Sequence, residues 1–190
     1  MLPALAKAFP GVLKKAALQE AHFIRGKIVE GIASQAPGGK PFKPLSPLTL
    51  AARRLAGFRG TKALIRTGDL RNSIVVVVGK DGSVAIGVSR NAKGEDGQDL
   101  VKVAEIMEFG AGPYVIQLTP KMVAWIAKLY EEAGIERAPS ARGGGKGYIV
   151  VKIPARPFMR PVFEKWGKPT DVRARLQARI AKLLKPYGGR

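Results

Sequence analysis

The stretch from Ile153 to Pro161, IPARPFMRP, is the segment that most restricts how this chain folds. Three of its nine residues are prolines, and each proline fixes its own φ angle and lacks a backbone N–H donor. The segment therefore forms neither the interior of a helix nor a central strand. The residue before a proline is also restricted to extended geometry. We predict a stiff elbow that carries a strand into a short helix.

The composition bounds the class of protein. A chain of 190 residues, 46% of them hydrophobic, fits one packed domain. The excess of 33 lysines and arginines over 14 acidic residues gives a formal net charge of +19. Such a charge favours a polyanionic neighbour, whether nucleic acid, anionic lipid or an acidic protein face, and solubility with a basic partner-binding surface explains it equally well. The lack of cysteine excludes disulfides, thiolate zinc sites and a cysteine nucleophile.

The N-terminal region reads as a helix rather than as a targeting segment. It has no long uninterrupted apolar run, so we expect neither a secretory signal nor a membrane span. Residues 1–36 are predicted to form a helix with Pro10 in its first turn, and Pro37 stops it. The apolar stripe of this helix consists of Leu13, Ala17, Ala21, Ile24, Ile28 and Ile32.

Helix-capping signals follow in the next segment. A proline-rich arm with a short helix is expected over residues 37–60, and either Ser46 or Thr49 is expected to cap that helix. Further on, Thr67 is predicted to cap a single helical turn. Asp69 then lies in the first turn, where the helix dipole favours a carboxylate.

The remainder of the chain predicts an α+β fold. Five β-formers from Ile74 to Val78 indicate a strand buried on both faces, and a turn at Asp81-Gly82 returns the chain as residues 84–88. Further strands are expected over 113–118 and 148–153. Helices are expected over residues 100–109, 120–133, 162–166 and 170–185. We therefore predict a small, mostly antiparallel sheet of about four strands, packed with a long N-terminal helix, a central helix and C-terminal helices.

The domain organisation follows from these elements. We expect a single domain over residues 1–190, with an α+β core at 61–166 and a basic C-terminal helix at 167–190. The last helix carries its apolar residues on one face and arginines and lysines on the other. That basic face could lie on a membrane, but a packed amphipathic helix is the better interpretation.

A search for catalytic motifs finds none that is complete. The GGGKG run around Lys146 lacks the glycine spacing and the following Ser or Thr of a phosphate-binding loop, so a glycine-rich turn explains it better. His22 is the only histidine and has no ligand at metal-binding spacing. Glu131 and Glu132 are adjacent on a helix and do not face each other. We predict no enzyme activity, no cofactor and no metal.

Five motifs occur in an order that resembles a known family. They are PFKPLSPLTLAARR, LIRTGDLRNSI, a hairpin ending in VAIGV, VAEIMEFG and IPARPFMRPVFEKW, and they span roughly residues 40–166. The chain resembles the virion morphogenesis proteins of tailed bacteriophages, the tail-completion or neck proteins. It departs from the family pattern at Phe42, where the family usually has Trp. Its Glu108-Phe109-Gly110 is closer to a related head–tail joining family.

This resemblance implies a structural role in the virion. Such proteins are small α+β subunits that form a ring, six-fold by family likeness, at the head–tail junction or at the top of the tail. The expected partners are copies of the chain itself and other neck or tail proteins, such as the connector and the tail tube. The expected location is the virion, and the host cytoplasm during assembly. A basic protein that binds nucleic acid without sequence preference is the alternative.

The matching motifs supply the candidate interface residues. They are Phe42, Pro44, Leu45, Thr67, Gly68, Leu70, Ser73, Glu108, Phe109, Gly110, Pro154, Arg156, Pro157, Phe158, Met159 and Arg160. In the elbow, Phe158 and Met159 could fill a pocket on a neighbouring subunit, and Arg156 and Arg160 could bind carboxylates. Equally, Phe158 and Met159 could plug this chain's own core, and both interpretations can hold together.

A ring at the head–tail junction would surround the path of the genome. Six basic residues are candidates for transient contact with DNA or for binding an acidic partner: Lys93, Arg142, Lys146, Arg175, Arg179 and Lys182. The first three are expected in loops, and the others share the last helix. DNA contact by such a ring should be weak, independent of sequence and steeply sensitive to salt.

Overall fold

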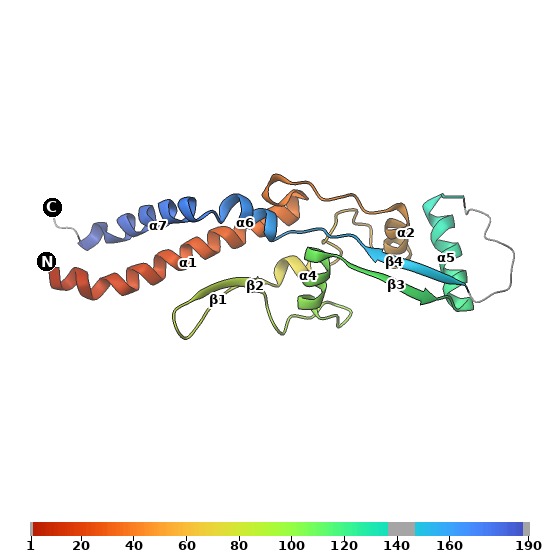
Figure 1. The fold of residues 1–190 in the computed structure, drawn as a ribbon, viewed down its shortest axis with the longest axis horizontal. Helices are drawn as coiled ribbons and strands as arrows, with labels where there is room; N and C mark the ends of the chain where they lie inside the picture. Colours follow the sequence, from red (N-terminus) through yellow and green to blue (C-terminus); the bar gives the residue numbers. More distant parts are fainter. Residues whose placement is uncertain (1, 137–146, 188–190) are drawn as a thin grey trace.

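One helix, α1 (Leu2–Ser34), spans about half the length of an elongated molecule (Figure 1). The structure is a computed structural model and describes residues 2–136 and 147–187. The last long helix, α7 (Pro169–Leu184), lies alongside the N-terminal half of α1. The other half of α1 packs against a β-hairpin and the short helix α6 (Arg160–Trp166).

The start of α1 corrects two predictions. Pro10 lies inside the helix rather than in its first turn. A proline removes one helical hydrogen bond and bends the helix, which need not end it. Leu13 is 42% exposed, whereas Val12 and Ala16 are buried, so the predicted stripe is wrong in this half of the helix. The reason is that this half faces α7 rather than the main core.

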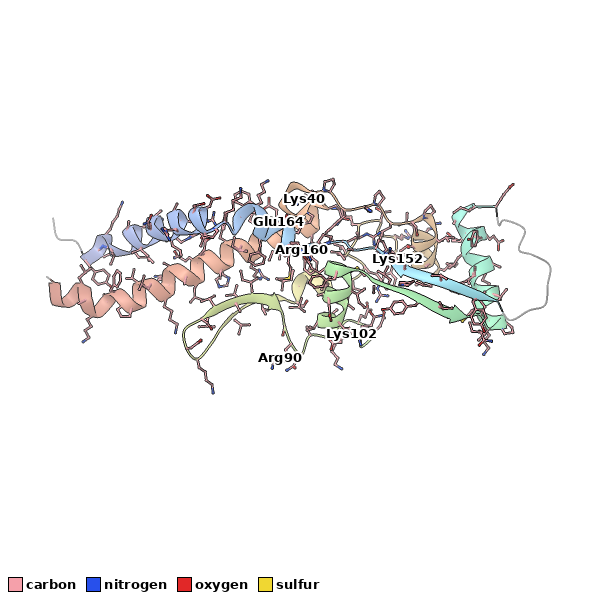
Figure 2. All side chains as sticks on the ribbon, in the orientation of Figure 1. Lys40, Arg90, Lys102, Lys152, Arg160 and Glu164 are labelled. Carbon is pink, nitrogen blue, oxygen red and sulfur yellow. The ribbon has the colours of Figure 1, made fainter. Side chains whose placement is uncertain are left out.

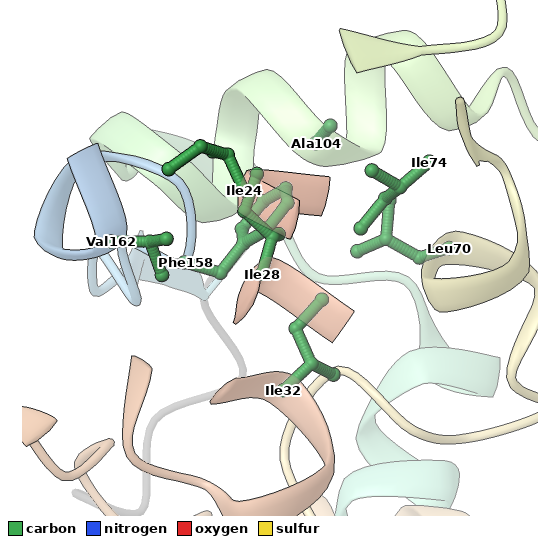
Figure 3. Close-up of a cluster of buried hydrophobic side chains, with 8 residues drawn as sticks. All are labelled: Ile24, Ile28, Ile32, Leu70, Ile74, Ala104, Phe158 and Val162. Atoms are coloured by element: carbon green, nitrogen blue, oxygen red, sulfur yellow. The ribbon is translucent and has the colours of Figure 1, made fainter. Parts of the chain in front are cut away.

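The main hydrophobic core brings together segments that are far apart in the sequence (Figure 3). Its buried members are Ile24, Ile28, Ile32, Leu70, Ile74, Ala104, Phe158 and Val162. They come from α1, the short helix α3 (Asp69–Asn72), the strand β1 (Ile74–Val78), α4 (Leu100–Phe109), the elbow and α6. The C-terminal half of the predicted α1 stripe is thus confirmed.

The four strands of the described residues form two separate two-stranded antiparallel sheets. β1 pairs with β2 (Val84–Val88), and β3 (Ala111–Gln117) pairs with β4 (Tyr148–Ile153). Only β1–β2 is a hairpin, because α5 (Pro120–Ala133) lies between β3 and β4 in the chain. The α+β class and the four antiparallel strands are confirmed. The strands do not join into one sheet, because β1–β2 packs on α1 while β3–β4 extends toward the opposite end of the molecule (Figure 1).

The β1–β2 hairpin is less buried than predicted. Ile74 is fully buried, but Val77 is 54% exposed and Val78 is 38% exposed. The strand itself is confirmed, and its expected burial on both faces is wrong. The exposed residues lie at the turn end of β1, which projects beyond the core (Figure 1).

The remaining helices begin and end close to their predicted bounds. Ser46 caps α2 (Pro47–Leu55) by accepting a hydrogen bond from the Thr49 amide. α5 (Pro120–Ala133) connects β3 to the segment that precedes β4, and its C-terminal half lies beside α2. The short helices η1 (Pro37–Gly39) and η2 (Lys185–Tyr187) follow α1 and α7. No helix among the described residues combines the length and apolarity that a membrane crossing needs.

The single turn of α3 is capped differently from the prediction. Its N-cap is Gly68, which has a φ angle of 95° that favours glycine. Thr67 precedes the N-cap; its hydroxyl donates to the Asp69 carboxylate (2.6 Å) and accepts a long hydrogen bond from the Asp69 amide (3.4 Å). Asp69 lies in the first turn of the helix, as predicted.

Replacing Ile74 by Asp should abolish folding, because an unpaired carboxylate would be buried in the core at a cost of several kcal/mol, a large share of a typical stability of about 5–15 kcal/mol. The matched control is Val77→Asp, on the same strand but exposed, which should cost about 1 kcal/mol or less. Circular dichroism with urea denaturation measures both. A native-like Ile74→Asp protein would contradict the core described above.

Candidate assembly surfaces

The proline-rich elbow is held by one carboxylate, that of Glu108 near the end of α4. Oε2 of Glu108 accepts hydrogen bonds from the backbone amides of Phe158 (2.8 Å) and Met159 (3.0 Å), and Oε1 accepts one from Arg160 (2.8 Å). Glu108 is only 8% exposed. These amides open α6, where backbone N–H groups lack helical partners and the helix dipole favours negative charge. A side chain of α4 therefore caps α6.

The end of α4 fits closely against the same elbow. The Arg156 amide donates to the carbonyl of Met107 (2.6 Å). Gly110 has a φ angle of 80°, and a Cβ there would come within 3.0 Å of the Ile153 carbonyl oxygen and 3.1 Å of the Ala155 amide nitrogen. Glycine is needed at this position for both reasons. We call this contact between residues 107–110 and 153–160 the Glu108 junction.

The elbow side chains divide between the interior and the surface. Phe158 is fully buried beside Ile24 and Ile28, so it plugs this chain's own core and is not available to a neighbour (Figure 3). Met159 packs partly buried against the same core. The Arg160 guanidinium lies 5.4 Å from the centre of the exposed Phe109 ring. The structure thus supports the core interpretation for Phe158.

Arg156 ties the elbow to the proline-rich arm. Its Nε donates to the Lys43 carbonyl and its Nη2 to the Pro44 carbonyl, both at 3.2 Å. On the other side of the arm, Nζ of Lys40 donates to the Glu164 carboxylate of α6 at 2.6 Å (Figure 2). This hydrogen bond and the lysine charge lower the pKa of Glu164. The arm is therefore bonded to the elbow through Arg156 and to α6 through Lys40.

The other candidate residues of the arm, of the TGDL turn (residues 67–70) and of the elbow lie either in the core or in a cleft. Phe42 packs against the core, and Ser73 is buried with its hydroxyl donating to the Leu70 carbonyl (2.8 Å). The remainder line a cleft of about 650 Å³ between the arm, the TGDL turn, α4 and β4. These cleft residues are Pro44, Leu45, Thr67, Gly68, Leu70, Pro154 and Arg156. The structure brings four of the five motifs to one cavity, because Val103 and Met107 of the VAEIMEFG motif also line it.

The cleft carries an excess of positive charge. Its charged lining residues are Lys43, Arg53, Arg66, Asp69, Lys152 and Arg156, five basic and one acidic. Burial lowers the pKa of the Arg53 guanidinium, and the nearby charges of Arg66 and Arg156 lower it further. The acidic member, Asp69, already accepts hydrogen bonds from the Thr67 hydroxyl and from the Glu95 amide, and these lower its pKa. We call this cavity the arginine cleft.

The two-stranded β3–β4 sheet exposes an apolar face that the sequence-based predictions had not included. Val115 and Val150 are paired directly across the two strands. Val115 is 69% exposed, Val150 is 68% exposed and Tyr148 is 62% exposed. Ile116 and Ile149 occupy the opposite face and are half-buried. We call Val115, Tyr148 and Val150 the β3–β4 face. Consecutive β-formers in YIVVKI signalled apolar residues on both faces of this strand.

The basic candidates of the last helix are largely engaged within the chain. Arg175 donates from Nε (2.8 Å) and Nη2 (2.6 Å) to Oε1 of Glu20, and Nε of Arg179 reaches Oε2 at 3.3 Å. Glu20 is only 6% exposed. Lys182 is exposed and, with Lys15, lines a groove of about 600 Å³ between α1 and α7. Lys93 is exposed in a loop, and Arg142 and Lys146 lie outside the described residues.

The described residues contain no cluster of three or more His, Cys, Asp or Glu side chains that could hold a metal ion. Neither protein-family models, nor curated proteins, nor solved structures match this chain when compared with it. The resemblance to phage proteins therefore depends on the five motifs alone.

Replacing Glu108 by Ala should lower the free energy of unfolding by about 2–4 kcal/mol, because three amides at the start of α6 would lose a charged acceptor. The control is Glu105→Ala, an exposed glutamate one turn earlier on α4, which should change stability by about 0.5 kcal/mol or less. Urea denaturation followed by circular dichroism measures both. Equal small effects would show that Glu108 does not hold the elbow.

Proposed function

We propose that this chain is a structural subunit that assembles with copies of itself into a closed ring in the neck or tail of a tailed phage. The observation that supports self-assembly is the exposure of the apolar β3–β4 face. Two valines and a tyrosine stand exposed side by side on a two-stranded sheet. A contiguous apolar patch of this kind marks a protein–protein contact, and an isolated two-stranded sheet gains stability when another element covers it.

The Glu108 junction sets the direction in which β3 and β4 leave the core. β3 begins at Ala111, directly after Gly110, and β4 ends at Ile153, directly before the elbow. Both strands therefore leave the core at the place where α4 and the elbow are bonded together. A projection fixed at its base loses little conformational freedom on binding, which favours association.

A projection at one end of an elongated subunit favours head-to-tail contacts between copies. The β3–β4 sheet and α5 lie at the same end of the molecule (Figure 1). Trp125, a residue of α5, is 52% exposed. A contact of this kind between unlike surfaces makes a ring when the rotation closes. The ring and its six-fold symmetry come from the family resemblance, as do the connector and tail-tube partners.

A second candidate function, transient DNA contact, is favoured by one feature. The groove between α1 and α7 presents Lys15 and Lys182, and the whole chain carries +19. A ring would multiply this charge around the path of the genome. Such contact would be electrostatic and independent of sequence.

Self-association should be lost in the double variant Val115→Lys and Val150→Lys, because burying two unpaired charges on the β3–β4 face would cost too much free energy. The control is Val77→Lys, an exposed valine (54%) on the β1–β2 hairpin, which should leave assembly unchanged. Sedimentation velocity over a range of concentrations measures both. Assembly that survives the double variant, or a wild-type protein that stays monomeric at high concentration, would overturn the proposal.

DNA contact is tested by a fluorescence titration of duplex DNA at several salt concentrations. We expect weak binding that falls steeply with salt and that weakens further in the double variant Lys15→Glu and Lys182→Glu. Arg175 and Arg179 are left unchanged, since they hold Glu20. No effect of the double variant would remove the groove from any DNA role, and tight, sequence-selective binding would favour a DNA-binding protein over a ring.

A further inference from the structure

The arginine cleft is lined by both apolar and basic residues. Leu45 from the arm, Leu100 and Val103 from α4, and Pro154 from the elbow line it alongside the basic residues. Lys152 of β4 also lines the cleft (Figure 2). Its volume of about 650 Å³ falls within the range of cavities that bind small molecules or a few side chains, roughly 300–1,000 Å³.

Two of the guanidinium groups in this cleft bond to no carboxylate of the described chain. Arg53 uses Nη1 to donate to the carbonyls of Gly60 (3.0 Å) and Lys62 (2.8 Å), and Arg156 donates to the carbonyls of the arm. The third, Arg66, is paired with Asp96 and lies over the Phe58 ring. A carbonyl carries no full charge, so the repulsion among these three cations is only partly offset within the chain.

We propose that the arginine cleft is a binding site for a peptide segment of an acidic partner protein, in which a carboxylate lies between apolar side chains. The carboxylate would be bound by the guanidinium fork of Arg156 or Arg53, whose planar donors match a carboxylate in pairs. The apolar side chains would cover the walls formed by the arm and α4. Burial is the main cause that lowers the pKa of Arg53, and the charges of Arg66 and Arg156 lower it further.

The chemistry of the cleft favours this occupant over others. Duplex DNA offers phosphates but no apolar side chains to cover the walls, because protein contacts to its backbone are polar. A second copy of this chain carries +19 itself, so an acidic partner is the better electrostatic complement. The proposal goes beyond the ring and does not require it, because the cleft is formed within one subunit.

The test uses isothermal titration of the full-length protein with two peptides. The first has the sequence Gly-Leu-Phe-Glu-Leu-Gly with blocked ends, and the second replaces its Glu by Gln. We expect the Glu peptide to bind at least about tenfold more tightly, because the charge-assisted bond is lost in the Gln peptide. Equal affinity of the two peptides, or no binding of either, would overturn the proposal.

Variants then place the binding in the cleft. Arg156→Gln together with Lys152→Gln should weaken the Glu peptide about tenfold or more, while the glutamine at 156 can still donate to an arm carbonyl. The matched control is Arg90→Gln together with Lys102→Gln, two exposed positions outside the cleft lining that should leave the affinity unchanged (Figure 2). An equal loss in both double variants would reduce the effect to general basicity and overturn the proposal.

Two further results distinguish the other occupants. Self-association that disappears in the Arg156→Gln and Lys152→Gln variant would assign the cleft to a second copy of this chain. Duplex DNA that displaces the Glu peptide at physiological salt would assign it to nucleic acid. Either result overturns the proposed partner. Should the cleft variant fail to fold, the comparison of the two peptides on the wild-type protein still decides.

Discussion

The bonds from Glu108 to three successive amides of the elbow are the interaction on which the rest of the structure depends. They cap α6, and by fixing the backbone there they direct Phe158 into the core against α1. On the other side of the same junction, β3 and β4 leave the core as a two-stranded antiparallel sheet. Because proline already restricts the elbow, little additional ordering is needed to form the junction. One buried carboxylate thus organises both the interior and the surface that we propose for assembly.

A second buried carboxylate organises the other half of the molecule. Glu20 of α1 accepts hydrogen bonds from Arg175 and Arg179 of α7, where the core is thin and none of the α7 side chains is fully buried. Breaking such a pair from one side leaves an uncompensated buried charge, which costs about 3–5 kcal/mol. The basic face of the last helix is therefore in part a structural device, and only the remaining cations, such as Lys182, are available to a partner.

Local signals in the sequence predicted most of the elements but not how they meet. Glycines, prolines and capping residues act over a few positions, so the bounds of the helices and strands could be read directly. The errors at Leu13 and Val77 come from packing between distant segments, which no local pattern encodes. One signal was present and unused: Glu108 follows Leu100 and Ala104 at four-residue spacing, as Glu20 follows Val12 and Ala16. An acid on the buried stripe of a helix needs a cationic or amide partner from elsewhere in the chain.

The central proposal is self-assembly of this chain, with the Glu108 junction inside and the exposed β3–β4 face outside. It is tested most directly by negative-stain electron microscopy of the purified wild-type protein, with its mass in solution measured on the same sample. Self-assembly predicts closed rings of uniform diameter and a mass several times that of one chain. A homogeneous population of single elongated subunits at the concentrations used for assembly would contradict it.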